Sequence, residues 1–397
     1  MLFRELLAEE LNKQRDEFTR FAAAQNGDLD DYLEKLASLN GKKHAEIAAL
    51  LGDSEDCGAV PAAETERAPQ FVVSFAERWA NHEEARRWAF AVLQNRTTFA
   101  ADGSQLFAER EVSLPVAAVQ IGWFENPHND ALGYEKQARF FVLSPGELLS
   151  EDEPVIPETR VGQRRFEAEI EKAKEFLLKK EGWQARGERM PLAFYDGTLL
   201  LSISLPKSRL QADFIDALVE LVRLSRDTRV PLVGYVDRSY ARDLLAMLDA
   251  VAGVRRAAPK TLDDVSVLHA SALRHWGDRT PFCYSRRRGL EAFIDERTNR
   301  SSVGFVYLQT TGQTTPARLD VPAWIYEENL LDELADVVRA ECVIGLGYPY
   351  ALETADQTAV ITLRDREIFL RALQDFAVRE KLAFNVSRKS ASKGRRR

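Results

Sequence analysis

The sequence predicts a mixed α/β protein, in which helices flank a sheet of parallel and antiparallel strands. Three strand-like segments follow one another between residues 97 and 144, and β-rich segments then alternate with amphipathic helical ones. Strands that follow directly on one another tend to pair antiparallel, whereas strands joined through a helix tend to run parallel. With 397 residues, of which 45% are apolar and 29% charged, the chain is expected to fold around a sizeable core.

Residues 1–95 are expected to form a helical region, which serves as a packing appendage or a dimerisation arm. Apolar residues recur with a helical period near its start, and residues 28–51 predict a second helix. Phe71, Phe75 and Trp79 are spaced by four residues and predict a third. Residues 53–69 are small and acidic with two prolines, which is typical of a linker.

Residues 96–385 are expected to form one domain that carries the sheet. Its predicted strands cover residues 97–101, 112–124, 139–144, 191–204 (interrupted by Asp196-Gly197) and 231–237, and residues 302–310 and 317–324 predict a hairpin. Its predicted helices cover residues 164–180, 211–225, 239–251 and 327–342, and a mixed segment begins at Gly347. Residues 386–397 are basic, and we expect a disordered tail that is either solvated or in contact with phosphates.

Several classes of protein are excluded by what the sequence lacks. No apolar run approaches the roughly 18 residues that a membrane helix needs, and the acidic N-terminus does not match a secretory signal. The three cysteines, Cys57, Cys283 and Cys342, are far apart and odd in number, so we expect a reducing cytoplasm and neither disulfides nor a thiolate zinc site. Without a GxxxxGKS/T loop, the chain is not expected to hydrolyse ATP.

Two aspartates stand at the ends of predicted strands in the same local sequence. Asp102-Gly103-Ser104 and Asp196-Gly197-Thr198 each follow a β-rich segment. In the second strand Leu192, Phe194 and Asp196 share one face, and a carboxylate on an apolar face needs a cation to neutralise it. That cation is either a divalent metal ion or a buried arginine, and an Asp-Gly pair is also typical of a simple turn.

The predicted helix between these strands carries one glutamate on its apolar side. Projection at 100° per residue gives an apolar stripe of Phe166, Ile170, Ala173, Phe176 and Leu177. Glu169 falls within the stripe, whereas Glu167, Glu171 and Glu175 fall on the opposite side. Glu169 is therefore the candidate site residue, unless it lies at a partly exposed edge of the stripe.

Carboxylates without histidine or cysteine favour a hard divalent cation, Mg²⁺ or Mn²⁺. Two such ions roughly 3.5–4 Å apart activate a water and stabilise the leaving oxygen of a phosphodiester. An aspartate on a strand, a glutamate on a helix and an aspartate on a second strand form the arrangement that an RNase H-like nuclease core requires. By this analogy Asp102, Glu169 and Asp196 predict a two-metal phosphodiesterase.

Beyond the carboxylates, four stretches of the sequence resemble the NurA family of DNA-repair nucleases. They are FAADGSQL (99–106), FYDGTLLL (194–201), YLQTTGQTTPARLDVPAW (307–324) and GYPYALETADQTAVIT (347–362), and they occur in the family's order. The resemblance implies an RNase H-like fold, manganese-dependent (or magnesium-dependent) nuclease activity on DNA in end resection, and a homodimer. It also implies a partner, the hexameric ATPase HerA.

The same resemblance implies roles for individual residues. The family's metal-binding aspartates match Asp102 and Asp196, and its intervening glutamate matches Glu169. Tyr348 is the tyrosine of the GYP motif and is expected either to position the attacking water or the scissile phosphate, or to be a hydrogen-bonded core tyrosine.

A departure from the family pattern occurs eight residues after Tyr348. Many archaeal members carry a histidine there, and this sequence has Asp356. A carboxylate at that position suits a hard cation, so Asp356 is a candidate metal ligand. Glu353, about one helical turn before it, is the competing candidate if the segment is helical.

The charge of the chain bears on how it would hold DNA. Its 54 basic and 62 acidic residues give a net charge of −8, which disfavours DNA binding over the whole surface and fits an enzyme to which a partner brings the DNA. Arg318 and Arg238 are candidate phosphate contacts, or ion-pair partners of carboxylates such as Asp320. Two alternative functions are a catalytically weak dimeric adaptor that docks a DNA motor, and a metal-dependent phosphatase.

Overall fold

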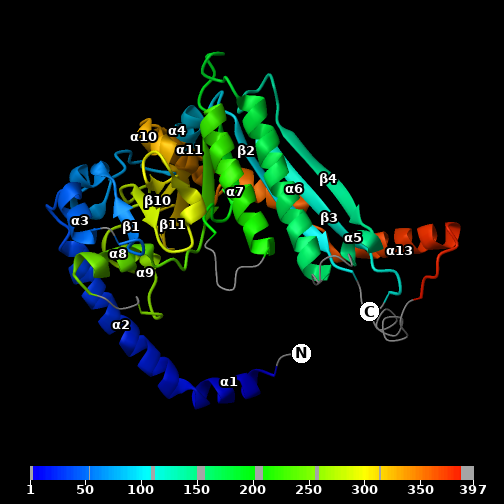
Figure 1. Ribbon diagram of the computed structural model, residues 1–397, viewed down its shortest axis with the longest axis horizontal. Helices are drawn as coiled ribbons and strands as arrows, with labels where there is room; N and C mark the ends of the chain where they lie inside the picture. Colours follow the sequence, from blue (N-terminus) through cyan, green and yellow to red (C-terminus); the bar gives the residue numbers. More distant parts are fainter. Residues whose placement is uncertain are drawn as a thin grey trace. The chain divides into compact units, whose positions relative to one another are not determined.

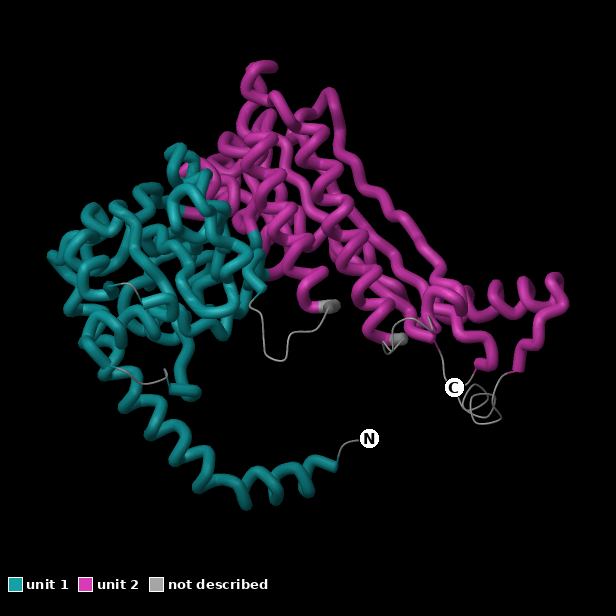
Figure 2. Tube along the Cα trace, viewed as in Figure 1, with its two compact units in different colours: residues 1–80, 198–203, 234–331 teal, residues 81–197, 204–233, 332–397 magenta. Residues whose placement is uncertain are grey.

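The computed structural model describes residues 3–52, 54–108, 112–149, 157–201, 209–254, 259–312 and 314–385. Figure 1 shows the helices and strands, and Figure 2 shows the two compact units into which they divide. Unit 1 comprises residues 1–80, 198–203 and 234–331, and unit 2 comprises residues 81–197, 204–233 and 332–397. The N-terminal helices therefore share a unit with residues 234–331.

Unit 1 combines antiparallel strands with short helices. Its strands pair in the order β1-β7-β10-β11-β6, where β6 is Leu232–Val236, and β8 pairs with β9. Its elements are α1 (Arg4–Lys13), α2 (Arg15–Ala37), α3 (His44–Leu51), β1 (Gly58–Pro61), η1 (Ala63–Arg67), η2 (Pro69–Phe71), α8 (Asp243–Val251), α9 (Asp264–Ser271), β7 (Cys283–Arg286), η3 (Glu291–Phe293), β8 (Ile294–Asp295), β9 (Arg300–Ser301), β10 (Val303–Leu308), β11 (Ala317–Pro322) and α10 (Ala323–Glu327). The predicted hairpin is confirmed as β10 and β11, which pair antiparallel.

The segment that was expected to be a linker is part of the sheet, so that expectation is wrong. Gly58–Pro61 forms β1, which pairs antiparallel with β7 and is largely buried. The small residues and the proline that predict a linker also suit a short strand at the edge of a sheet. Helices α2 and α3 then pack with this part of unit 1 through buried residues such as Tyr32 and Ile47.

The helix predicted from Phe71, Phe75 and Trp79 is also wrong. Only a 3-10 turn, η2, forms at the start of this stretch, and the next α-helix begins at His82. The rings of Phe75 and Trp79 instead pack against Trp276, with centroids 5.5 and 4.8 Å away. The four-residue spacing of Phe75 and Trp79 therefore comes from a non-helical segment in which both rings contact Trp276, and not from a helix face.

Unit 2 contains strands in the order β4-β3-β2-β5, followed by β6 (Leu232–Val236), which begins in unit 2 and ends in unit 1. Strand β3 is antiparallel to both β2 and β4, whereas β5 is parallel to β2. The other elements are α4 (His82–Leu93), β2 (Thr98–Leu106), β3 (Ala117–Asn126), β4 (Glu135–Leu143), α5 (Pro145–Leu148), α6 (Pro157–Lys180), β5 (Leu192–Asp196), α7 (Arg209–Thr228), α11 (Leu331–Ile344), α12 (Tyr350–Ala359) and α13 (Leu363–Arg379). Three antiparallel strands, then helix α6, then a strand parallel to the first is the RNase H-like arrangement, and the predicted mixed α/β fold class is confirmed.

Helices α6 and α12 cover opposite faces of the unit 2 sheet. The ring of Phe99 on β2 stacks on Phe176 of α6 with centroids 4.6 Å apart, and the ring of Phe124 on β3 meets Tyr350 of α12 at 5.8 Å. Phe99 pairs with Glu125 in the register, and successive residues of a strand alternate between faces, so Phe99 and Phe124 point in opposite directions. Figure 1 shows α6 lying along β2 and β3.

Candidate nuclease site

Asp102 and Asp196 are neighbours on one face of the unit 2 sheet. Strands β2 and β5 are parallel, and their register pairs Ala100 with Phe194 and Ala101 with Tyr195. One residue further along each strand, Asp102 lies beside Asp196, at the spacing of about 4.8 Å that separates adjacent strands. Both aspartates share a face with Ala100 and Phe194 and therefore point to the side that α12 covers.

Asp356 and Tyr348 come to the same face from the C-terminal part of the chain. The carboxyl group of Asp356, on α12, shares a hydrogen bond with that of Asp102, and Tyr348 Oη donates to Asp196 Oδ1 at 3.2 Å. The pKa of Asp102 is raised to about 6, chiefly by burial and also by the nearby Asp196 and Asp356 carboxylates, against the opposing hydrogen bond from the Gly103 amide. The negative charges that a divalent cation would neutralise are therefore concentrated here.

Asp356 and Glu353, the two candidate metal ligands in this segment, make different contacts. Residues Tyr350–Ala359 form α12, so the segment is helical. Glu353 accepts a hydrogen bond from Gln357 of the same helix at 3.2 Å, whereas Asp356 contacts Asp102. The contacts favour Asp356 as the residue that joins the cluster.

Glu169 approaches the site from the α6 face. Its side chain is 12% exposed, against 42% for Glu167, 53% for Glu171 and 47% for Glu175, which confirms the predicted orientation. Glu169 Oε1 lies 2.6 Å from the point where a Cβ on Gly103 would stand. The missing side chain of Gly103 thus leaves the space that the glutamate occupies next to β2.

The surroundings of Glu169 favour binding of a positive charge. Its Oε1 is buried and has no hydrogen-bond partner among the described residues, although Arg165 Nε lies 3.3 Å away. The pKa of Glu169 is raised to about 8, chiefly by burial and also by the Asp102 and Asp196 carboxylates, against the opposing effect of Arg165. A carboxylate in this position is stabilised when a cation is bound beside it.

The residues present suit a hard divalent cation, since the donors are carboxylate oxygens. Asp102, Asp196 and Asp356 lie on the side of the sheet that α12 covers, and Glu169 lies on the opposite side, which α6 covers. Within the described ranges, no three histidine, cysteine, aspartate or glutamate side chains converge closely enough to hold an ion as they stand. The donor set therefore fits Mg²⁺ or Mn²⁺ chemically, and the carboxylates would have to draw together to bind it.

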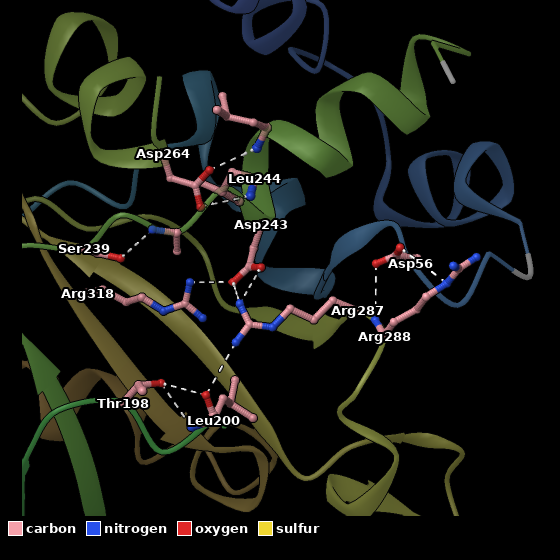
Figure 3. A network of polar contacts seen from close by, with 12 residues as sticks. Asp56, Thr198, Leu200, Ser239, Asp243, Leu244, Asp264, Arg287, Arg288 and Arg318 are labelled. Atoms are coloured by element: carbon pink, nitrogen blue, oxygen red, sulfur yellow. Dashed lines mark hydrogen bonds and ion pairs between the residues drawn. The ribbon is translucent and has the colours of Figure 1, made fainter. Parts of the chain in front are cut away.

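The two candidate arginines differ in their surroundings. Arg318 is 3% exposed, with Nη1 2.6 Å from Asp243 and Nε 2.7 Å from Asp320, within the buried polar network of unit 1 that Figure 3 shows. Arg318 is therefore an ion-pair partner of carboxylates, which was the alternative interpretation of this residue. Because it is buried, it is not available to contact DNA. Arg238 is 53% exposed and lies 3.7 Å from Asp263, so it stays a candidate for phosphate binding.

Three residues of the site were missed by sequence reasoning. Arg165 lies one helical turn before Glu169, and the same helical projection would have placed it on the same side. Gly103 was noted only as a turn residue. Glu341 is buried on α11 and accepts a hydrogen bond from Ala351 N at 2.9 Å, at the start of the helix that carries Asp356; nothing local in the sequence indicates that contact.

The family model of the NurA domain matches residues 96–361 of this chain, which is well over half of its length. The chain belongs to the NurA family. Family membership and the RNase H-like arrangement together indicate a nuclease that acts on DNA with a divalent metal ion. No curated protein matches this NurA sequence, and among the described residues no helix combines the length and apolar composition that crossing a bilayer requires.

Solved structures similar to this NurA chain include an endonuclease domain and two Argonaute structures. The catalytic domain of human endonuclease V is 15% identical with a TM-score of 0.32, and the match covers 76% of this chain and 92% of that one. The Argonaute of Aquifex aeolicus is 11% identical (TM-score 0.26, 67% and 28% covered), and the C-terminal lobe of a budding yeast Argonaute is 12% identical (TM-score 0.26, 68% and 48% covered). Because these TM-scores are low, the RNase H-like fold is assigned from the strand order of unit 2 and not from these similarities.

Proposed function

We propose that this NurA family member is a two-metal-ion deoxyribonuclease, in which Asp102, Glu169, Asp196 and Asp356 are the metal ligands. The observation that carries the proposal is the register of β2 and β5, which makes Asp102 and Asp196 neighbours, together with the contact between Asp102 and Asp356. Mn²⁺ or Mg²⁺ bound there supplies an activated water and stabilises the leaving oxygen of the phosphodiester.

The protein side chains have distinct tasks in this proposal. Tyr348 holds Asp196 through its hydroxyl and so keeps that carboxylate turned toward the site. Asp102, whose pKa is raised and whose carboxyl group is hydrogen-bonded to that of Asp356, must lose its proton before it can serve as a ligand. Glu169 must likewise lose the proton that burial favours before it can serve as a ligand.

The biological setting belongs to the same proposal. We infer a homodimer in the cytoplasm that resects DNA ends together with a HerA-type hexameric ATPase. The net charge of −8 and the lack of a GxxxxGKS/T loop support dependence on a partner, since the chain has neither a generally basic surface nor the loop that such ATPases use to bind phosphates.

The experiment that tests the nuclease proposal uses Asp102→Asn and Asp196→Asn, which remove charge and keep shape. Each variant is expected to lose nearly all cleavage of linear DNA in Mn²⁺ and to keep its thermal unfolding midpoint. Glu171→Gln is the matched control, because Glu171 lies on the solvent side of α6 with 53% of its side chain exposed. Full activity in both aspartate variants would refute the assignment.

A second function, an adaptor that docks a DNA motor, is favoured by the N-terminal helices. Apolar side chains of α1 and α2 are exposed, including Leu6 at 58%, Phe18 at 58% and Phe21 at 51%. Such exposed apolar residues are typical of interaction surfaces. The adaptor function would be preferred if the wild-type protein binds a HerA-type ATPase but cleaves no DNA with any divalent cation, and if Phe18→Ser abolishes that binding.

A further inference from the structure

Arg165 stands next to the carboxylates and has no role in the site described so far. It lies four residues before Glu169 on α6, and residues at that spacing share a helix face. Its Nε is 3.3 Å from Glu169 Oε1, and its Nη1 donates to the Gly103 carbonyl oxygen at 3.4 Å. Since 39% of the side chain is exposed, the guanidinium touches both the site and solvent.

The contacts of Arg165 hold it loosely. A guanidinium carries five N–H donors, and the described residues give Arg165 one long hydrogen bond, while its buried Nε has none. Arg318, by comparison, makes ion pairs at 2.6 and 2.7 Å and is 3% exposed. Arg165 therefore has donors left for another anion, whereas Arg318 is committed to structure.

A cation bound at Glu169 would change what Arg165 faces. The guanidinium is paired with a carboxylate that the nuclease proposal assigns to a metal ion, and two positive charges beside one carboxylate repel each other. The anion that arrives with the substrate is the DNA phosphate, and the planar fork of arginine matches phosphate oxygens in a bidentate way.

We propose that Arg165 binds a backbone phosphate of the DNA beside the carboxylate cluster, after exchanging Glu169 for that phosphate. The proposal rests on the nuclease function. It places a positive charge where the carboxylates would otherwise repel the substrate, which a protein with a net charge of −8 needs at the point of cleavage. The competing role is that Arg165 only neutralises Glu169 and never meets DNA.

The two roles predict different measurements on Arg165→Gln and Arg165→Lys. Binding of a short fluorescent DNA is measured by anisotropy with Ca²⁺, which prefers oxygen ligands, and binding of Mn²⁺ alone is measured by calorimetry. Loss of a charge-assisted hydrogen bond is expected to weaken DNA binding by Arg165→Gln about tenfold or more. Mn²⁺ affinity should not fall, because the substitution removes a charge that repels the cation. Arg165→Lys keeps the charge and should recover part of the DNA affinity.

The neighbouring Arg164 provides the control. It pairs with Glu171 at 3.2 Å and lies over the ring of Phe141, away from Glu169, so Arg164→Gln is expected to bind DNA as the wild type does. Thermal unfolding of all variants shows whether a loss of binding reflects a loss of fold.

Wild-type DNA affinity in Arg165→Gln would overturn the assignment of Arg165. If Mn²⁺ affinity changes while DNA affinity does not, the neutralising role is supported instead. A wild-type protein that cleaves no DNA with any divalent cation overturns the nuclease proposal instead. The anisotropy measurement decides on Arg165 in that case as well, because it does not require cleavage.

Discussion

Replacing Gly103 by alanine is the most direct test of how the two faces of the sheet meet at the site. A Cβ at this position would lie 2.6 Å from Glu169 Oε1, 2.6 Å from Arg165 Cγ and 2.9 Å from Ile121 Cδ1. Gly103 is not among the residues with a left-handed backbone, so alanine is opposed by these neighbours and not by its own φ. The substitution therefore pushes Glu169 and Arg165 away from β2 without altering a charge.

The size of the effect follows from these distances. Non-bonded heavy atoms sit comfortably at about 3.5–4.0 Å, so the neighbours must retreat by about 1 Å. Overpacking of this kind costs about 1–3 kcal/mol of stability. A displacement of about 1 Å at a catalytic group costs on the order of 100-fold in rate, so the nuclease activity of Gly103→Ala is expected to fall far more than its stability.

The assay pairs urea unfolding with Mn²⁺-dependent cleavage of linear DNA. Gly162→Ala is the matched control, because Gly162 lies on α6 and an added Cβ there meets nothing within 4 Å. The control is expected to be neutral, or more stable by up to about 1 kcal/mol, as alanine is the better helix former. If Gly103→Ala keeps wild-type stability and wild-type cleavage, Glu169 does not occupy the space beside Gly103.

Three further predictions use other parts of the structure. The pKa of Glu169 is raised to about 8 and that of Asp102 to about 6, so protons compete with the metal and calorimetric Mn²⁺ affinity should rise from pH 6 to 8; a flat profile would contradict this. Arg318→Ala removes the guanidinium that pairs with buried Asp243 and Asp320, leaving Asp243 with Arg287 alone, and should cost about 3–5 kcal/mol in urea unfolding; an unchanged midpoint would be the opposite result. Gly122→Ala places a Cβ 2.5 Å from the backbone of α12 and should displace Asp356 and reduce cleavage, unlike the Gly146→Ala control.

Local patterns in the sequence were sufficient for several parts of the site. Asp102 and Asp196 could be found because a charged residue interrupts a β-rich segment, and Glu169 because one glutamate interrupts the apolar side of a helix. Each of these signals lies within a few residues of the chain. The pairing of β2 with β5, which makes the aspartates neighbours, joins residues about ninety positions apart and has no such local signal.

The parts that could not be predicted depend on distant partners. Strand β1 consists of small residues and a proline, and it forms because β7, more than two hundred residues later, offers its edge. Trp276 likewise decides the path of the chain around Phe75. Strand formation depends on such neighbours more than on intrinsic preference. Short strands and irregular aromatic segments could therefore not be predicted from the sequence, whereas long amphipathic helices could.

The register of β2 ties these elements together. Asp102 and Gly103 are successive residues, so they face opposite sides of the sheet, toward α12 and α6 respectively. A slip of β2 by one residue would exchange these faces, turning Asp102 away from Asp196 and bringing Asp102 or Ser104 to the place beside Glu169 where glycine is needed. A slip of β3 by one residue would likewise bring a side chain against the α12 backbone in place of Gly122. The two glycines therefore do more than leave space: each makes the shifted alignment collide with a helix, and together they hold the carboxylates in the one register where they can meet.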